Sequence, residues 1–196
     1  RVQARGDDLL VLLGQGDPIR STTTCGLLGG AVSRLCGIRS GASDAEARAA
    51  LEARIGRNVA EHSERTTVFM GELCGVHWPA EALPELRAAR QNPRIMGDHI
   101  AQAWLAFVRA EAAVRPVLLV LDDLQWSDAL TVTLVDAALR ELGSSPFLML
   151  ALARPEVQEL FPELWAPRLA VLPLRPLGPA VTARFVRQVL GEGISD

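Results

Sequence analysis

The second half of the chain alternates uninterrupted apolar runs with stretches whose apolar residues recur at helical spacing. Short apolar runs bounded by turn residues are typical of buried strands. They predict strands at Val117–Leu121, Phe147–Ala153 and Ala170–Leu174, and the stretches between and after them predict helices at Asp128–Leu142 and Ala180–Leu190. Because apolar strands joined by helices form parallel sheets covered on both faces, we expect an α/β fold, a three-layer sandwich with a mostly parallel sheet.

The first half contains one strand pattern followed by a long helical stretch. Asp8–Leu13 is a short apolar run closed by glycine and proline, which predicts a strand and a turn. Helices are expected at about Thr23–Cys36 and Ser43–Glu61, as short pieces over Val68–Arg90, and from the N-cap Asp98 to about Val114. Ser43 opens a capping-box pattern, and Ser127 is assigned as the N-cap of the helix after Val117–Leu121. Residues from about 20 to 114 are therefore expected to form a helical insertion.

The composition fits a folded domain that works in the cytoplasm. The 196 residues are 49% hydrophobic, which is enough for a sizeable core. The net charge of -3 and the scattered basic residues argue against direct nucleic-acid binding. No apolar stretch reaches the roughly 20 residues that cross a membrane, and the first residues lack the apolar core of a signal peptide. The three cysteines show no C-x-x-C spacing, as expected for reduced thiols.

Charged side chains follow two neighbouring predicted strands. Asp122 and Asp123 come directly after Val117–Leu121, and Arg154 comes after Phe147–Ala153. Because parallel sheets bind ligands beyond the carboxyl ends of their strands, these residues predict a site at that edge. Consecutive strand residues point in opposite directions, so the two carboxylates are expected to divide their roles. Asp122 would hold Mg²⁺, and Asp123 would orient and deprotonate a water for attack on a phosphoryl group. Arg154 would contact phosphate or pair with one of the aspartates.

Each of these residues also has an ordinary structural explanation. Aspartates after a strand often cap the next turn, and Arg154 before a proline can be a surface strand terminus. Gln125 either reaches a phosphate or water, or holds the loop. Trp126 is interpreted as a core wedge beneath the loop rather than as a stacking platform for a base. The three histidines have no partner at ligand spacing and are assigned no metal.

The motif VLLVLDDLQWSD resembles the Walker B segment of STAND-class P-loop ATPases, the AAA-related modules of large signalling proteins. The blocks PFLMLALARPEV, LFPELW and LAVLPLRPLGPAVTARFVRQVLG follow in the order seen in ATPase modules fused behind bacterial serine/threonine protein kinase domains. The stretch GELCGVHWPAEALPELRAARQNPRIMGDHIAQAW resembles the intervening helical stretch of the same group of ATPase modules. The resemblance therefore extends from about Asp8 onward.

The resemblance implies ATP and Mg²⁺ as ligands. Asp122 matches the Mg²⁺-associated Walker B acid, Asp123 the water-activating acid and Arg154 a phosphate-sensing residue. Gln125 joins Arg154 as a candidate for cofactor binding. Residues 1–175 would form a partial P-loop NTPase-like α/β domain, and residues 176–196 would begin a helical lid.

One part of the family pattern does not occur in the chain. A P-loop requires G-x-x-x-x-G-K-[ST], and all 20 basic residues here are arginine. Gly14–Gly16 is followed by Asp17 and Pro18, which would place a negative charge and a missing N–H at the phosphate. In the family, the P-loop strand comes first and lies between the strands that Phe147–Ala153 and Ala170–Leu174 resemble. We therefore expect a segment of a longer protein that binds ATP poorly by itself and has exposed sheet edges that favour self-association.

The resemblance implies a regulatory ATP-binding or ATPase module of a multidomain bacterial signalling protein, linked to a serine/threonine protein kinase. Its partners would be the nucleotide and other domains of the same polypeptide, with no nucleic acid and no membrane. Two alternatives stay open: a nucleotide-independent scaffold for protein contacts, and the ATPase module of a transcriptional regulator. Hydrolysis is expected only from an intact protein that also contains the P-loop.

Overall fold

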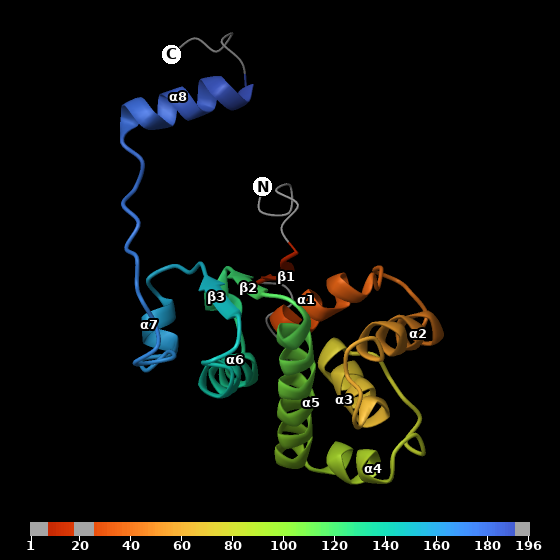
Figure 1. The fold of residues 1–196 in the computed structure, drawn as a ribbon. Helices are drawn as coiled ribbons and strands as arrows, with labels where there is room; N and C mark the ends of the chain where they lie inside the picture. Colours follow the sequence, from red (N-terminus) through yellow and green to blue (C-terminus); the bar gives the residue numbers. More distant parts are fainter. Residues whose placement is uncertain (1–7, 18–25, 191–196) are drawn as a thin grey trace. The chain divides into compact units, whose positions relative to one another are not determined.

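The computed structural model describes residues 8–17 and 26–190 and separates into two units, Arg1–Ala166 and Pro167–Asp196 (Figure 1). The first unit contains a sheet and the helices that pack against it. The second contains one helix, α8 (Pro179–Leu190), and the segment that precedes it. The sheet and its edges therefore belong to the first unit alone.

Three parallel strands form the sheet of the first unit. β1 (Leu10–Gln15) and β3 (Phe147–Ala151) flank β2 (Val117–Asp122), so the spatial order β1-β2-β3 follows the sequence. The register aligns Leu10 with Val117 and Val117 with Phe147, which brings the carboxyl ends of the strands to one edge. The α/β class and the parallel sheet predicted from the sequence are confirmed.

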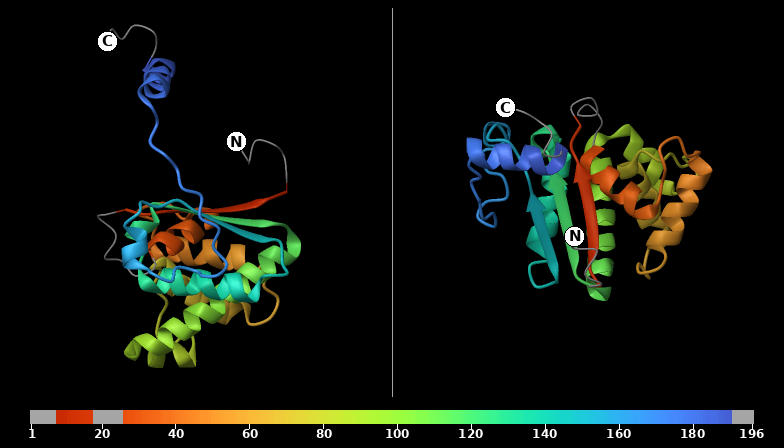
Figure 2. Two further views of the ribbon diagram at one scale, coloured as in Figure 1. Left: turned by 90° about the vertical axis from the view of Figure 1, so that its left-hand side faces the viewer. Right: turned by 90° about the horizontal axis from the view of Figure 1, so that it is seen from above.

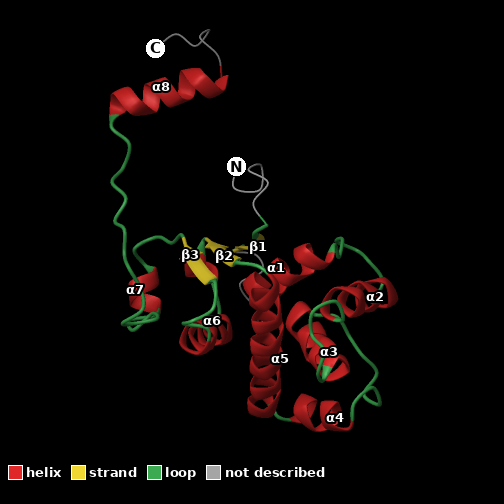
Figure 3. Ribbon diagram, viewed as in Figure 1, coloured by secondary structure: helices red, strands yellow, loops and turns green. Residues whose placement is uncertain are grey.

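Helices connect these strands, as parallel pairing requires (Figure 3). α6 (Ala129–Glu141) joins β2 to β3, and the short α7 (Val157–Leu160) follows β3. The predicted helical insertion is also confirmed, because five described helices lie between β1 and β2: α1 (Gly26–Cys36), α2 (Asp44–Ile55), α3 (Ser63–Cys74), α4 (Pro84–Gln91) and α5 (Pro93–Val114). None of the described helices is both long enough and apolar enough to span a membrane.

The capping box predicted at the start of α2 is confirmed. The Ser43 hydroxyl accepts a hydrogen bond from the Glu46 N–H at 3.3 Å, and the Glu46 carboxylate accepts one from the Ser43 N–H at 2.9 Å. Each side chain thus satisfies a backbone donor that the first turn leaves without a partner inside the helix.

Two other predicted helix starts are wrong. α5 begins at Pro93 rather than at Asp98, because the Asn92 side chain accepts from the N–H of Arg94 at 3.1 Å. α6 is capped by Asp128 rather than Ser127, since Asp128 Oδ1 accepts from the Thr131 N–H at 2.9 Å. Asparagine and aspartate are among the strongest N-cap residues, and in each case the true cap is the residue whose oxygen reaches these donors.

The helices of the first unit pack on one face of the sheet, as the left view of Figure 2 shows. On this face, β1 buries Leu12 and β2 buries Leu119 and Leu121. The opposite face has no helix among the described residues of the unit, and there Leu148 is 66% exposed and Leu150 is 49% exposed. The outer edge of β3 also has no strand partner in the described part of the chain.

The largest buried side chains come from the helical insertion and tie it to the sheet. Trp104 and Phe107 of α5 and Phe69 of α3 are fully buried. The Trp104 indole N–H donates to the Leu134 carbonyl at 3.1 Å, which joins α5 to α6. Because α1 also packs against β1 and α5 against β2, the insertion is part of the same core as the strands.

In the second unit, the strand predicted at Ala170–Leu174 is wrong. This segment has no regular secondary structure, and Leu172 and Leu174 are 81% and 87% exposed. A strand forms only where a neighbour pairs with its backbone, and the described sheet contains no strand from this segment. α8 matches the predicted helix, with Pro179 in its first turn.

Candidate functional site

The predicted site residues lie at the carboxyl edge of the sheet. Asp122 is the last residue of β2 and pairs with Gln15, the last residue of β1. β3 ends at Ala151, two residues earlier than predicted, and the following backbone continues beside the loop after β2. In that loop the Leu124 N–H donates to the Leu152 carbonyl at 3.0 Å. Backbone hydrogen bonds therefore continue between the segments that follow β2 and β3, past the last residues of the two strands.

Asp123 turns the chain away from the strand. It adopts a left-handed backbone conformation with φ of 56°, which is uncommon for residues other than glycine and is better tolerated by aspartate than by bulky residues. The Asp122 carboxylate accepts from the Asp123 N–H at 3.1 Å. The Asp123 carbonyl accepts from the Trp126 N–H at 3.0 Å, which closes the 3-10 turn η2 (Leu124–Trp126). This turn leaves the Asp123 side chain exposed at the sheet edge.

Gln125 connects Asp123 to the end of β3. Its side chain is buried, with 8% of the residue exposed. The amide nitrogen donates to Asp123 Oδ1 at 2.8 Å, and the amide oxygen accepts from the Arg154 N–H at 3.1 Å. Of the two roles left open by the sequence, these contacts match the one that holds the loop. A cofactor contact for Gln125 stays a prediction.

Arg154 joins the site through its backbone. Its side chain is exposed, and the guanidinium makes no polar contact with other described residues. The structure thus brings together all four residues singled out in the sequence, linked in the order Asp122, Asp123, Gln125, Arg154 by hydrogen bonds. The phosphate contact predicted for the Arg154 side chain stays a prediction.

A pocket of about 400 Å³ opens beside Asp123 on the side of β1. Gly16, Arg34 and Trp126 line it together with Asp123. Trp126 is 36% exposed, so its interpretation as a core wedge is wrong; the buried residue of this turn is Leu124, at 1%. The aromatic ring faces the pocket because the 3-10 turn directs Leu124, rather than Trp126, into the core.

Gly16 allows the loop after β1 to approach the loop after β2. A Cβ atom at this position would lie 2.3 Å from the Asp123 carbonyl oxygen, far inside the contact distance. The Gly16 N–H donates to the Asp122 carbonyl at 2.8 Å. In the sequence this glycine stands out only as part of an incomplete P-loop pattern. The structure shows instead that it supports the backbone of the acidic pair.

The donor set fits a hard cation such as Mg²⁺. Asp122, the residue predicted to hold the ion, supplies carboxylate oxygen ligands, and Mg²⁺ is commonly bound through one or two carboxylates, its own waters and substrate phosphates. In residues 8–17 and 26–190, no group of three or more histidine, cysteine or acidic side chains converges into an all-protein metal cage.

Comparison with known proteins bears on this geometry. The family model described as "AAA ATPase domain" matches residues 2–151, a span that ends at the last residue of β3. No curated protein and no solved structure gives a significant match to the chain.

Proposed function

Because the chain belongs to the AAA ATPase domain family, we propose that its sheet edge forms the metal-binding and water-activating part of an ATPase site. The family generally acts on ATP with Mg²⁺. The observation that carries the proposal is the chain of hydrogen bonds from Asp122 through Asp123 and Gln125 to the backbone of Arg154. It holds two acids and one arginine where two neighbouring parallel strands end, which is where such sheets bind ligands.

Each charged residue receives a separate task in this proposal. Asp122 is the residue that would hold Mg²⁺, which neutralises charge on the phosphates when bound. Asp123 accepts a proton from water while the water oxygen bonds to the γ-phosphorus; the bond from that phosphorus to the bridging oxygen breaks and ADP leaves. The Arg154 guanidinium is exposed, permanently charged and suited to contact phosphate oxygens.

The phosphate-binding loop of the site is proposed to come from outside the 196 residues. The 196 residues contain no lysine, so they contain no G-x-x-x-x-G-K-[ST] motif. A P-loop would supply backbone N–H groups and a lysine, a residue type that the chain does not contain. We expect the chain alone to bind ATP–Mg²⁺ too weakly for detection at micromolar concentrations by calorimetry.

The biological role we propose is regulation within a multidomain bacterial signalling protein. The order of DDLQWSD and ALARPEV resembles STAND-class modules linked to serine/threonine protein kinases, which act in the cytoplasm through other domains of the same polypeptide. The outer edge of β3 has no strand partner among the described residues, and this supports self-association. A nucleotide-independent scaffold is the alternative. The two acids and the exposed arginine at the strand ends favour the ATPase, because a scaffold has no need of charges there.

Mutation of the acidic pair tests the proposal. In a protein that carries these residues together with a P-loop, Asp123→Asn should abolish ATP hydrolysis while ATP binding persists. Asp98→Asn on the exposed surface of α5 is the matched control and should leave hydrolysis unchanged. Hydrolysis at the wild-type rate in the Asp123→Asn variant would show that the assigned role is wrong.

A further inference from the structure

Gln125 is the only described side chain that joins the two parts of the candidate site, the loop after β2 with Asp123 and the segment after β3 with Arg154. It lies in the 3-10 turn after β2, yet its amide bonds to a side chain of its own loop and to the backbone after β3. A buried side chain with both polar ends engaged is held in one rotamer, because any other leaves a buried polar group without a partner.

The chemistry of the two partners determines which way the amide faces. The Arg154 N–H can only donate, so the end of the amide beside it must be the carbonyl oxygen. The NH₂ group is then directed at Asp123, where a carboxylate oxygen accepts. The reversed amide would place two donors together at Arg154 and two acceptors together at Asp123. The backbone at the end of β3 thereby sets the direction of a hydrogen bond to the acid at the end of β2.

We propose that Gln125 is a positioning residue that orients the Asp123 carboxylate and couples it to the backbone of Arg154. The inference rests on the proposed function for the role of Asp123 as the acid that activates water. Donation to Oδ1 holds one carboxylate oxygen and leaves Oδ2 for the water. A ligand that draws the Arg154 side chain toward itself also moves the Arg154 N–H, and Gln125 transmits that movement to Asp123.

Asp123 needs such a restraint. Asp123 is exposed, and its backbone adopts the left-handed conformation at a turn rather than lying inside a strand. A carboxylate in solvent is free to rotate, and misplacement of a catalytic group by about 1 Å can lower a rate by about 100-fold. The hydrogen bond from Gln125 supplies an orientation that the exposed side chain does not obtain from packing.

Nuclear magnetic resonance on the 196-residue chain tests the coupling without any activity. The Gln125 side-chain amide protons should exchange more slowly with solvent than those of Gln91, which is exposed at the end of α4. Asp123→Ala should speed that exchange and shift the Arg154 backbone amide resonance. In a Gln125→Met background, the same Asp123→Ala change should no longer shift Arg154. An equal Arg154 shift with and without Gln125 would overturn the proposal.

Hydrolysis by a protein that also carries the P-loop provides the second test. Gln125→Met should lower kcat by about 100-fold and change KM for ATP–Mg²⁺ by less than about twofold, since it misplaces the acid while both ends of the Gln125 amide are already engaged by protein groups. The matched control, Gln91→Met, should change neither constant. A Gln125→Met change in KM alone would contradict a positioning role.

Exchange of the two side chains tests the directions of the two hydrogen bonds. In the double variant Asp123→Asn/Gln125→Glu, the amide and the carboxylate trade places. The amide at position 123 can then donate to the carboxylate at position 125, which can still accept from the Arg154 N–H. This variant should be more thermally stable than Gln125→Met, and a melting temperature no higher than that of Gln125→Met would overturn the assigned directions. If the wild type itself does not hydrolyse ATP, the proposed function fails, and the resonance comparison still decides whether Gln125 couples the two strand ends.

Discussion

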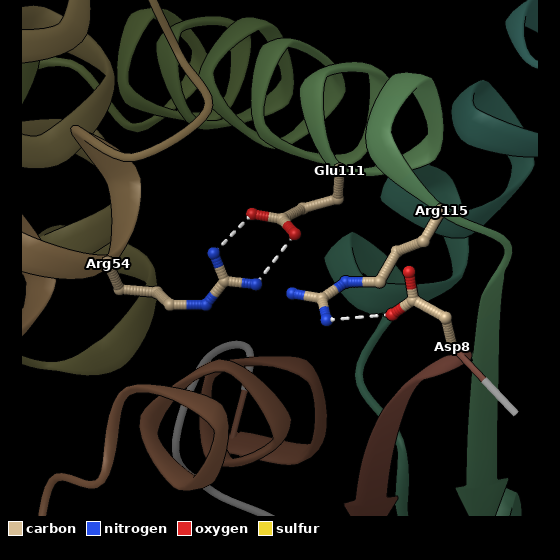
Figure 4. A network of polar contacts seen from close by, with 4 residues as sticks. All are labelled: Asp8, Arg54, Glu111 and Arg115. Atoms are coloured by element: carbon tan, nitrogen blue, oxygen red, sulfur yellow. Dashed lines mark hydrogen bonds and ion pairs between the residues drawn. The ribbon is translucent and has the colours of Figure 1, made fainter. Parts of the chain in front are cut away.

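Replacing Glu111 should destabilise the protein more than any change to a surface ion pair. Arg54 of α2 donates two parallel hydrogen bonds of 2.6 Å each to the carboxylate of Glu111 of α5 (Figure 4). Both residues are buried: Glu111 is 0% exposed and Arg54 is 7% exposed. In Glu111→Gln, the Arg54 guanidinium stays buried, has no counter-charge and loses one of its two acceptors. Breaking a buried pair by removing one partner typically costs about 3–5 kcal/mol.

A second arginine places this site at the upper end of that range. Figure 4 shows the Arg115 guanidinium pointing toward that of Arg54. The Nε atom of Arg115 is buried with no hydrogen-bond partner among the described residues, and its ion pair at 3.4 Å is with Asp8, whose side chain is 80% exposed. Glu111 is thus the only buried carboxylate in this drawn network, and its loss leaves two cations facing each other. We expect a loss of about 4–5 kcal/mol in the free energy of unfolding.

Urea unfolding followed by circular dichroism measures this loss. Glu141→Gln breaks the exposed Arg109–Glu141 pair, whose side chains are 58% and 50% exposed, and should cost less than about 1 kcal/mol. Arg54→Met/Glu111→Leu removes both buried charges and should recover most of the stability lost in Glu111→Gln. The reasoning is refuted if Glu111→Gln costs no more than Glu141→Gln, or if the double variant is less stable than Glu111→Gln alone.

Three further predictions concern α1, α2 and α3. Gly29→Ala should destabilise the protein by about 1–3 kcal/mol in thermal unfolding, because the new Cβ atom would lie 2.1 Å from a carbonyl oxygen of α3. Gly30→Ala is the control: the nearest atom that its Cβ would meet lies 3.9 Å away, so this change should be neutral or stabilising. Burial raises the pKa of Cys36 to about 11 and that of Cys74 to about 12, so peptide mapping should find both unlabelled by iodoacetamide at pH 8 until urea is added. Hydrogen bonds from the backbone and side chain of the N-cap Ser43 lower the pKa of Glu46. The stability that the ionised Glu46 gives the fold is complete above the ordinary glutamate pKa and is lost as pH falls through the lowered value. The difference in Tm between the wild type and Glu46→Gln should therefore be present at pH 7 and shrink in acid.

Local patterns in the sequence were sufficient for the α/β class and for the position of the acids. Apolar runs place β2 and β3, and the residue that follows each run must lie at the carboxyl edge of a parallel sheet. The Ser43 capping box could be predicted in the same way, because both of its hydrogen bonds join residues three positions apart. Where an interaction is confined to a few consecutive residues, the sequence contains all of its partners.

Tertiary structure decided whatever depends on a distant partner. Ala170–Leu174 has a strand composition but is not a strand, because strand formation requires a neighbour for the backbone. The Arg54–Glu111 pair joins residues 57 positions apart, and no local pattern distinguishes these two from the charged residues on the surface. Gln125 shows both limits. Its place beside Asp123 could be read from DDLQW, but its partner after β3 lies 29 positions away, and only the folded sheet brings that N–H within 3.1 Å of the amide.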